Sequence, residues 1–298
     1  MRISDNLRFN LFKANMLKIK EQMDKTQEMI ASGKRILAPS DDPVSAAQGI
    51  KFQAELSLNT RLKTNLERAK MLDSLYETAL NSIHDLLSEA KQVAIEQASD
   101  TMEESTRRSS AEVIKGIIEQ LVTIGNTRSG ETYIFAGKKP TAAPYTLNDD
   151  YSATFNGTEE TNSIYASGTQ QIRFGMSGSE VFTDSDLGID VFSVLKGLKE
   201  ALEANDREGI RSALDGLNEA LSLTEKNISY VGTHMERVES MLSEKETRDV
   251  NLNEILSELV DADIVSLVTE LNMLSTAYQA LLYTMEKVKD LSILNYLR

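Results

Sequence analysis

The hydrophobic and polar positions follow one pattern at the two ends of the chain and another in its middle. At each end, apolar residues recur at alternating steps of three and four, the spacing of a helix that buries one narrow side. The N-terminal set is Phe9, Phe12, Met16, Ile19, Met23, Thr26 and Ile30. The C-terminal set is Ile264, Leu267, Leu271, Leu274, Tyr278, Leu281, Met285 and Val288. This spacing is typical of coiled-coil partners, so each end is predicted to be a helical arm that packs against another helix.

A predicted break separates each arm from the body of the chain. The first helix is predicted over residues 5–32, because Gly33 can end it in the left-handed conformation and Lys34 and Arg35 suit its negative end. The segment that follows contains a capping residue and a proline suited to the first turn of the next helix. Its residues are Pro39, Ser40, Asp41, Asp42 and Pro43. At the other end, Asp261 and Asp263 mark the break before the C-terminal arm.

Long amphipathic stretches lie between the arms. A second helix is predicted from residue 43 to residue 99, with a length on the order of 80 Å at 1.5 Å per residue. A third follows over residues 102–125. Helical patterns return over residues 191–204, 208–223 and on to about 259. Helices of this length predict a rod.

Glycines, prolines and short alternating runs interrupt the helical pattern between residues 130 and 189. Strands are predicted at 132–136, 151–155, 170–174 and 180–182, and Asn156-Gly157 is a suitable tight turn between two of them. The fold class is therefore mostly α, with a β-rich insert at one end of the rod. The predicted domains are the arms 1–38 and 261–298, the rod halves 39–129 and 190–260, and the insert 130–189.

Composition and charge restrict the possible functions. The 298 residues include no cysteine and no tryptophan, so disulfides, thiolate catalysis and the usual structural zinc sites are not expected. The apolar runs are too short to span a bilayer, and residues 1–30 lack the pattern of a secretory signal. Of the net charge of −14, residues 1–37 contribute +4 and residues 264–298 contribute 0, which leaves −18 on the body. An acidic body argues against nucleic acid and anionic membranes as partners.

Candidate chemistry is sparse. Residues 125–130 have the glycine spacing of a phosphate loop, but Glu131 stands where a lysine is required. His84 and His234 are the only histidines and have no second ligand at metal spacing. The sequence therefore predicts no enzymatic activity, no metal site and no cofactor. A narrow stripe also buries little surface alone, so we expect the arms to be frayed in an isolated chain and to fold when neighbouring subunits complete them.

Several segments resemble the bacterial flagellin superfamily, and the proline-bracketed segment favours its branch from the junction between hook and filament. The similar segments cover nearly the whole chain. They are residues 3–6, residues 32–47, residues 125–128, Tyr133-Ile134-Phe135-Ala136-Gly137, Phe155-Asn156-Gly157, residues 178–182, residues 261–263, residues 269–272, residues 277–280 and residues 291–297.

The resemblance implies a structural subunit whose terminal helices pair and line the inner tube of a helical polymer. It implies contacts with further copies of the chain, with flagellin and with the adjacent hook-associated protein 1. It also implies export without a cleaved signal peptide through the flagellar type III apparatus, escorted by a chaperone, to the extracellular flagellum. Two alternatives remain open: a short flagellin that forms the filament itself, and a cytoplasmic coiled-coil adaptor.

Overall fold

The computed structural model describes residues 2–99, 102–165, 171–184 and 188–296. The chain divides into two compact units. The terminal unit consists of residues 1–59 and 248–298, and the central unit consists of residues 60–247. The division falls within two long helices, α2 (Pro43–Gln97) and α6 (Arg207–Val260). Each unit is described separately below.

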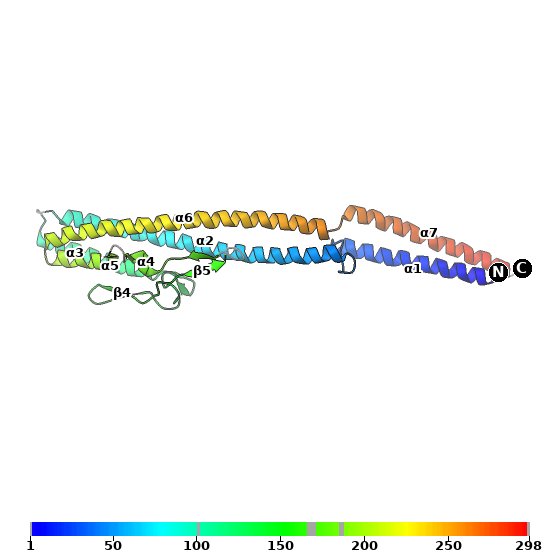
Figure 1. The fold of residues 1–298 in the computed structure, drawn as a ribbon, viewed down its shortest axis with the longest axis horizontal. Coiled ribbons are helices and arrows are strands. Elements are labelled where there is room, and N and C mark those ends of the chain that lie inside the picture. Colours follow the sequence, from blue (N-terminus) through cyan, green and yellow to red (C-terminus); the bar gives the residue numbers. More distant parts are fainter. Residues whose placement is uncertain (1, 100–101, 166–170, 185–187, 297–298) are drawn as a thin grey trace. The chain divides into compact units, whose positions relative to one another are not determined.

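The central unit is built on four helices that pack along one another (Figure 1). They are the longer parts of α2 and α6 together with α3 (Glu104–Gly125) and α5 (Val191–Glu203). The helices contribute mostly aliphatic side chains to their core, and the fully buried ones include Leu80, Ile83 and Leu87 of α2 and Leu195 of α5. The buried positions recur every three or four residues because only one side of each helix faces its neighbours. The predicted helices agree with these elements to within two residues at each end. The predicted helix 208–223 and the helical stretch that follows it to about 259 form a single helix, α6.

Between α3 and α5, the residues that the structure describes form four separate antiparallel pairs of short strands and one short helix, α4 (Gly178–Phe182). The pairs are β1 (Arg128–Ser129) with β2 (Thr132–Tyr133), β3 (Tyr145–Leu147) with β4 (Ala153–Phe155), β5 (Asn162–Tyr165) with β6 (Gln171–Phe174), and β7 (Thr183–Asp184) with β8 (Ile189–Asp190).

The insert packs along the helices rather than at an end of them, in contrast to the predicted tip position. Phe135, Tyr145 and Phe182 lie in the same core as the helical side chains. The ring of Phe135 lies edge-on to Tyr76 of α2 at 5.3 Å between centroids, and Phe182 stacks on Phe192 of α5 at 4.9 Å. The hydroxyl of Tyr76 donates a hydrogen bond to the Ile134 carbonyl oxygen at 2.5 Å. Aromatic side chains therefore join the insert to the helices.

Two local predictions within the insert are wrong. Residues 180–182 belong to helix α4 and not to a strand, because Ser177 and Glu180 form a capping box. The Ser177 hydroxyl accepts from the Glu180 amide at 3.2 Å, and the Glu180 carboxylate accepts from the Ser177 amide at 3.1 Å. Asn156-Gly157 follows β4 instead of turning a hairpin. The turn between β3 and β4 lies at residues 148–152, where Asn148 and Asp150 supply the side-chain hydrogen bonds.

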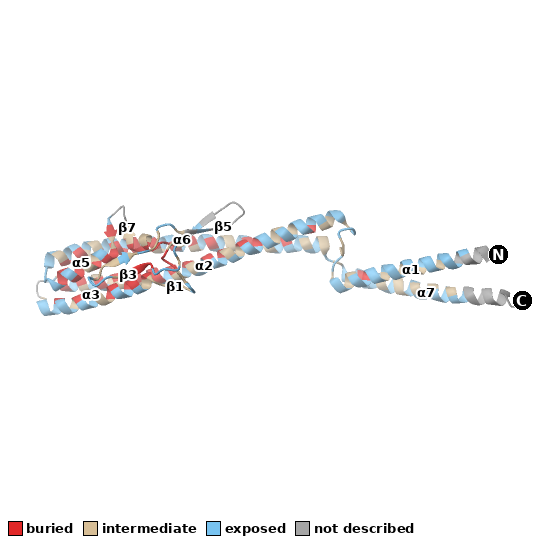
Figure 2. Ribbon diagram, turned by 90° about the horizontal axis from the view of Figure 1, so that it is seen from below, coloured by how far each residue is buried: buried red, intermediate tan, exposed pale blue. Residues whose placement is uncertain are grey.

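In the terminal unit, α1 (Arg2–Ser32) and α7 (Ile264–Tyr296) lie side by side (Figures 1 and 2). Gly33, at φ +69°, ends α1 in the left-handed conformation that glycine adopts without strain. Pro43 is the first residue of α2, and the Asp42 carboxylate accepts from the Ser45 amide at 3.1 Å as its N-cap. No helix in the described part of the chain is long and apolar enough to cross a membrane.

Candidate assembly surface

The two predicted stripes face each other along the α1–α7 pair, and we call this contact the seam. On α1, Met16, Ile19, Met23 and Ile30 are half-buried, and Thr26 is buried. On α7, Leu267 is only 8% exposed. The remaining half-buried seam residues are Phe12, Leu271, Leu274, Tyr278, Leu281 and Met285. The seam therefore joins the two ends of one chain.

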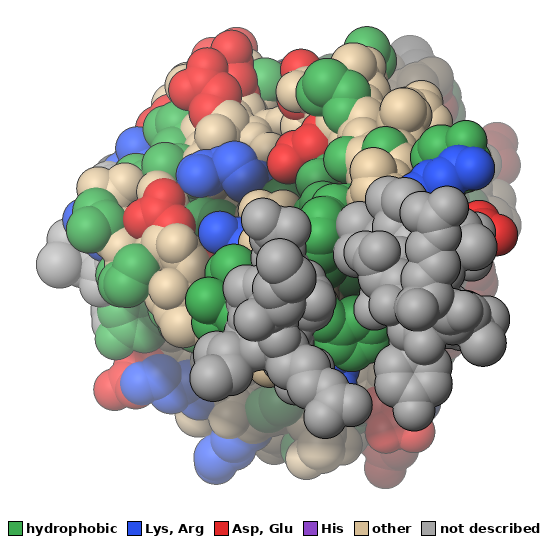
Figure 3. All heavy atoms as spheres, turned by 90° about the vertical axis from the view of Figure 1, so that its right-hand side faces the viewer, with side chains coloured by type: hydrophobic (Ala, Val, Ile, Leu, Met, Phe, Trp, Pro, Cys, Tyr) green, Lys and Arg blue, Asp and Glu red, His purple; other side chains and the backbone are tan. Residues whose placement is uncertain are grey.

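The seam is incompletely covered. Phe9 and Ile264, at opposite ends of the described seam, are 47% and 41% exposed. The side chain of Val288 lies outside the described residues. Two helices can shield only the strip between them, so the outer half of each seam residue stays in contact with water. Figure 3 shows hydrophobic side chains among the polar ones on this face of the molecule.

The two linkers that contain the predicted junction residues are joined within the terminal unit. The linker after α1 lies antiparallel to the linker before α7, with Lys34 opposite Asp261. Two backbone hydrogen bonds flank this bridge: the Arg35 amide donates to the Val260 carbonyl at 2.7 Å, and the Ala262 amide donates to the Gly33 carbonyl at 2.9 Å. The two breaks in the helices are therefore held together.

Arg35 has a role that the sequence did not indicate. Its guanidinium donates to the Leu259 carbonyl oxygen at 2.8 Å, in the last turn of α6. The cation therefore stabilises the negative end of α6 and not that of α1, where it was predicted to act. A partner 224 positions away along the chain leaves no local signal.

The two aspartates of the proline-bracketed segment have different tasks. The Asp41 carboxylate accepts from the backbone amides of Leu37 and Ala38 at 3.2 and 3.0 Å and pairs with Lys25 of α1 at 2.6 Å. The hydrogen bond from Lys25, more than those from the backbone, holds the pKa of Asp41 below its usual range. Asp42 caps α2 and lies 3.5 Å from the Arg35 guanidinium. Hydrogen bonds from Ser45 are the main reason that the pKa of Asp42 is also lowered.

The other junction residues shape the linkers. Asp263 caps the N-terminus of α7, since its carboxylate accepts from the amides of Val265 and Ser266 at 3.0 and 3.2 Å. Pro39 and Ser40 are exposed in the turn that brings Asp41 back to the Ala38 carbonyl, to which the Asp41 amide donates at 2.9 Å. Pro39 restricts the turn and Asp41 satisfies its amides, whereas Pro43 begins α2 and Asp42 satisfies an amide of its first turn.

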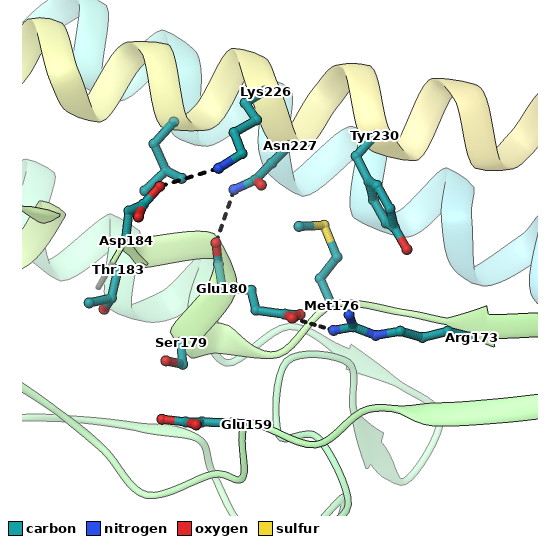
Figure 4. Close-up of a pocket in the computed structure, with 11 residues that line it drawn as sticks. Glu159, Arg173, Met176, Ser179, Glu180, Thr183, Asp184, Lys226, Asn227 and Tyr230 are labelled. Carbon is teal, nitrogen blue, oxygen red and sulfur yellow. Dashed lines mark hydrogen bonds and ion pairs between the residues drawn. The ribbon is translucent and has the colours of Figure 1, made fainter. Parts of the chain in front are cut away.

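A cleft of about 480 Å³ in the central unit is an alternative candidate site (Figure 4). It lies between α4 and α6. The charged side chains that line it pair with one another: Arg173 with Glu180, and Lys226 with Asp184 at 3.3 Å. Asn227 donates to the Glu180 carbonyl at 3.2 Å. These contacts hold α4, β6 and β7 against α6. The charged side chains of the cleft are therefore used in packing the insert onto the helix.

The two histidines differ in their surroundings. His234 of α6 is buried, and its Nδ1 lies 2.8 Å from the carboxylate of Asp73 on α2. His84 is partly exposed, with Asp85 and Glu225 at 3.9 and 3.7 Å. In the residues that the structure describes, no three His, Cys, Asp or Glu side chains come together as a metal site.

The fold and the paired terminal helices are those of a known structural class. Residues 3–139 match the bacterial flagellin N-terminal helical region, and residues 214–297 match the bacterial flagellin C-terminal helical region. The chain belongs to the bacterial flagellin superfamily.

Within this superfamily, the chain is similar to proteins of the hook–filament junction. It is 25% identical to flagellar hook-associated protein 3 of Salmonella typhimurium over 98% of both chains. It is 23% identical to a flagellin of Halalkalibacterium halodurans over 88% of this chain and 87% of that one. The crystal structure of FlgL from Bacillus cereus has the same fold, with a TM-score of 0.59 and 19% identity over 70% of this chain and 99% of the other.

Proposed function

We propose that this protein is a structural subunit of the bacterial flagellum that forms the junction between hook and filament. It joins neighbouring subunits through its two terminal helices and carries out no catalysis. The full-length similarity to hook-associated protein 3 supports the location. The terminal unit supports the mode of action.

The observation that carries the proposal is the lack of a core in the part of the terminal unit that the structure describes. Among the described residues, twenty large apolar side chains are exposed, and fifteen of them lie in residues 1–59 and 248–298. Leu252 and Leu267 are the buried apolar residues of this unit in the described part of the chain. Concentrated apolar exposure of this kind marks a surface that another protein covers.

The expected partners follow from this position. Further copies of the chain would lie beside it in the same layer and cover the exposed side chains of the terminal unit. Flagellin would contact this layer on one side, and hook-associated protein 1 would contact it on the other. We also propose that the chain reaches the extracellular flagellum through the type III export apparatus with the help of a chaperone. Arms that gain much of their burial from neighbours are compatible with passage in an unfolded form.

A deletion strain tests the location. Cells that lack the gene should build hooks but release flagellin into the medium, and a plasmid-borne copy should restore filaments. A strain without the gene that grows normal filaments would contradict the proposal.

Because the chain is also similar to a flagellin, the alternative function is that of a short flagellin that forms the filament itself. Purified protein distinguishes the two. A flagellin should grow into long filaments at high concentration, whereas a junction subunit should stop at short assemblies. Electron microscopy of a concentration series, with a known flagellin as control, measures the difference.

The arms can be tested separately. We infer that a dilute chain has frayed arms, because its seam is only half covered. Circular dichroism should then show helix content per residue that rises with protein concentration. A fragment of residues 40–260 should show no such rise. Full helicity of the intact chain at every concentration would exclude frayed arms.

A further inference from the structure

The Asn156-Gly157 pair lies in an irregular segment after β4 and has no part in the proposed assembly. It is the one place in the sequence where glycine follows asparagine. The side chain of Asn156 is exposed. An exposed asparagine before glycine is chemically labile, because the flexible backbone lets the glycine nitrogen reach the carbonyl carbon of the asparagine side chain.

The attacking nitrogen is available at this position. In the part of the chain that the structure describes, the Gly157 amide donates no hydrogen bond, although both neighbouring amides do. The Asn156 amide donates to the Pro144 carbonyl oxygen at 2.8 Å, and the Thr158 amide donates to the Ala136 carbonyl oxygen at 3.2 Å. The Gly157 nitrogen therefore gives up no hydrogen bond when it reacts.

The hydrogen bonds of the Asn156 side chain involve its nitrogen and not its carbonyl carbon. The Nδ2 atom donates to the Thr146 hydroxyl oxygen at 2.9 Å and to the Thr154 carbonyl oxygen at 3.5 Å. Because the side chain is exposed, water can supply the proton that this nitrogen needs in order to leave. These bonds leave the carbonyl carbon open to attack.

Packing requires glycine at position 157. A Cβ atom there would lie 2.5 Å from the ring of Phe155 and 3.1 Å from the Ala136 carbonyl oxygen. Only a residue without a side chain fits, and such a residue also obstructs ring closure least. The fold therefore fixes beside Asn156 the residue that makes it reactive.

Asn81 provides a comparison within the same chain. It is also exposed, and it is followed by another small residue, Ser82. Both residues lie inside α2, where the Ser82 amide belongs to the helical hydrogen-bond ladder and the backbone cannot bend toward the Asn81 side chain. Asn81 should therefore stay intact.

We infer that Asn156 is a site of spontaneous deamidation. The Gly157 nitrogen loses its proton to hydroxide and bonds to the side-chain carbonyl carbon of Asn156. The bond from that carbon to Nδ2 breaks, and ammonia leaves with a proton taken from water. Water then opens the resulting succinimide ring. Attack of water at the side-chain carbonyl gives aspartate, and attack at the main-chain carbonyl gives isoaspartate, in which the main chain continues through the side-chain carbons.

Isoaspartate should break the contacts that hold this segment to the start of the insert, because it lengthens the main chain by a carbon atom before Gly157. Thr158 makes two contacts beyond this point: its amide donates to the Ala136 carbonyl oxygen, and its hydroxyl accepts from the Lys138 amide at 2.7 Å. Since pairing with β3 fixes β4, the added atom displaces Thr158 from both partners. Aspartate keeps the chain length and should preserve the two contacts.

Peptide mapping of the full-length protein tests the site after incubation at mildly acidic and at mildly alkaline pH. At Asn156, mass spectrometry should detect a gain equal to the mass of water minus that of ammonia, and fragmentation should separate isoaspartate from aspartate. The reaction should be faster at alkaline pH, and about tenfold or more faster than at Asn81. Asn156→Gln should stay unmodified over the same period, because a glutamine side chain closes the larger ring much more slowly. Asn156 that remains intact for as long as Asn81 would overturn the inference.

Hydrogen exchange tests the structural consequence. Aged protein should lose protection of the Lys138 and Thr158 amides in proportion to its isoaspartate content. Freshly prepared Asn156→Asp carries the new charge on a main chain of natural length and should keep that protection. Equal losses in both proteins would assign the effect to charge and overturn the role of the added carbon. The inference does not depend on the proposed function, since neither measurement bears on the location between hook and filament.

Discussion

The central and terminal units share long helices but bury their side chains very differently. The central unit encloses a continuous core that runs from Tyr76 and Ile83 to the aromatic rings of the insert. The terminal unit has half-buried seam residues and an exposed outer surface (Figure 2). Four packed helices with an insert can shield apolar side chains from water, whereas two paired helices cannot. This difference supports a division of roles, in which the central unit provides stability and the proposed assembly uses the exposed side chains of the terminal unit.

The largest effect on stability should come from the aromatic core of the central unit. Phe135 is fully buried between Tyr76 and Phe182. Phe135→Ala should cost about 3–5 kcal/mol, because it removes the ring and leaves a cavity. The melting temperature should fall by about 6–20 °C. In the terminal unit, Leu271→Ala removes a half-buried side chain and should cost about 1 kcal/mol. Thermal unfolding monitored by near-ultraviolet circular dichroism measures both, and equal losses would contradict the division of roles.

The largest effect on assembly should come from a charge in the seam. Leu271→Asp and Met16→Asp each place a carboxylate between α1 and α7, where burial without a partner costs several kcal/mol. The central unit should melt as before, while sedimentation shows no assembly and cells shed their filaments. Gln279→Glu adds the same charge at an exposed position of α7 and serves as the control. Normal motility of either seam variant at usual protein levels would argue against the seam as part of the assembly surface.

The helices and the seam could be predicted because their signals are periodic. Every described side chain of the two stripes except Phe9 and Ile264 is half-buried or buried. Two helix boundaries have local causes. Gly33 ends α1 because glycine adopts the left-handed conformation, and Pro43 begins α2 because its φ is already fixed near the helical value. The capping box at Ser177 was also readable in the sequence, as a serine followed three residues later by a glutamate. The same segment also suits a strand because of Val181 and Phe182, so its local sequence is ambiguous.

Contacts between distant residues could not be predicted. Arg35 binds a carbonyl at the end of α6, and Lys25 reaches Asp41 across the turn after α1. The location of the insert along the helices also depends on long-range packing, since Phe135 and Tyr145 give no sign of which helix they meet. Which side of each arm remains exposed depends on the pairing of the two stripes with each other, and this pairing is itself a contact between distant residues.

A smaller effect is expected at the junction in acid. Lys25 lowers the pKa of Asp41 in the folded state, so the ionised carboxylate stabilises the linker above its unfolded pKa of about 4. That contribution is lost as the pH falls through the lower folded pKa. Hydrogen-exchange protection of the Leu37 and Ala38 amides, which donate to Asp41, should therefore decrease below about pH 4.

Two variants isolate this carboxylate. Asp41→Asn should lower the protection of both amides at neutral pH and remove most of its dependence on acid. Asp24→Asn changes an exposed carboxyl of α1 and should leave the profile unaltered. Protection of both amides that is constant from pH 7 to pH 2 in the natural chain would contradict a role for Asp41.

The smallest effect should come from the surface ion pairs between α2 and α6 in the central unit. Lys70 lies 2.8 Å from Glu239, yet the two side chains are 45% and 70% exposed. Solvent screens such a pair, so Lys70→Ala should cost less than about 1 kcal/mol, and the cost should shrink further at high salt. Leu66→Ala, in the buried contact with Val238 on the same stretch, should cost about 2–5 kcal/mol at any salt concentration. Chemical denaturation of both variants at low and high salt makes the comparison. A larger loss from Lys70→Ala than from Leu66→Ala would mean that charge, and not apolar packing, holds these two helices together.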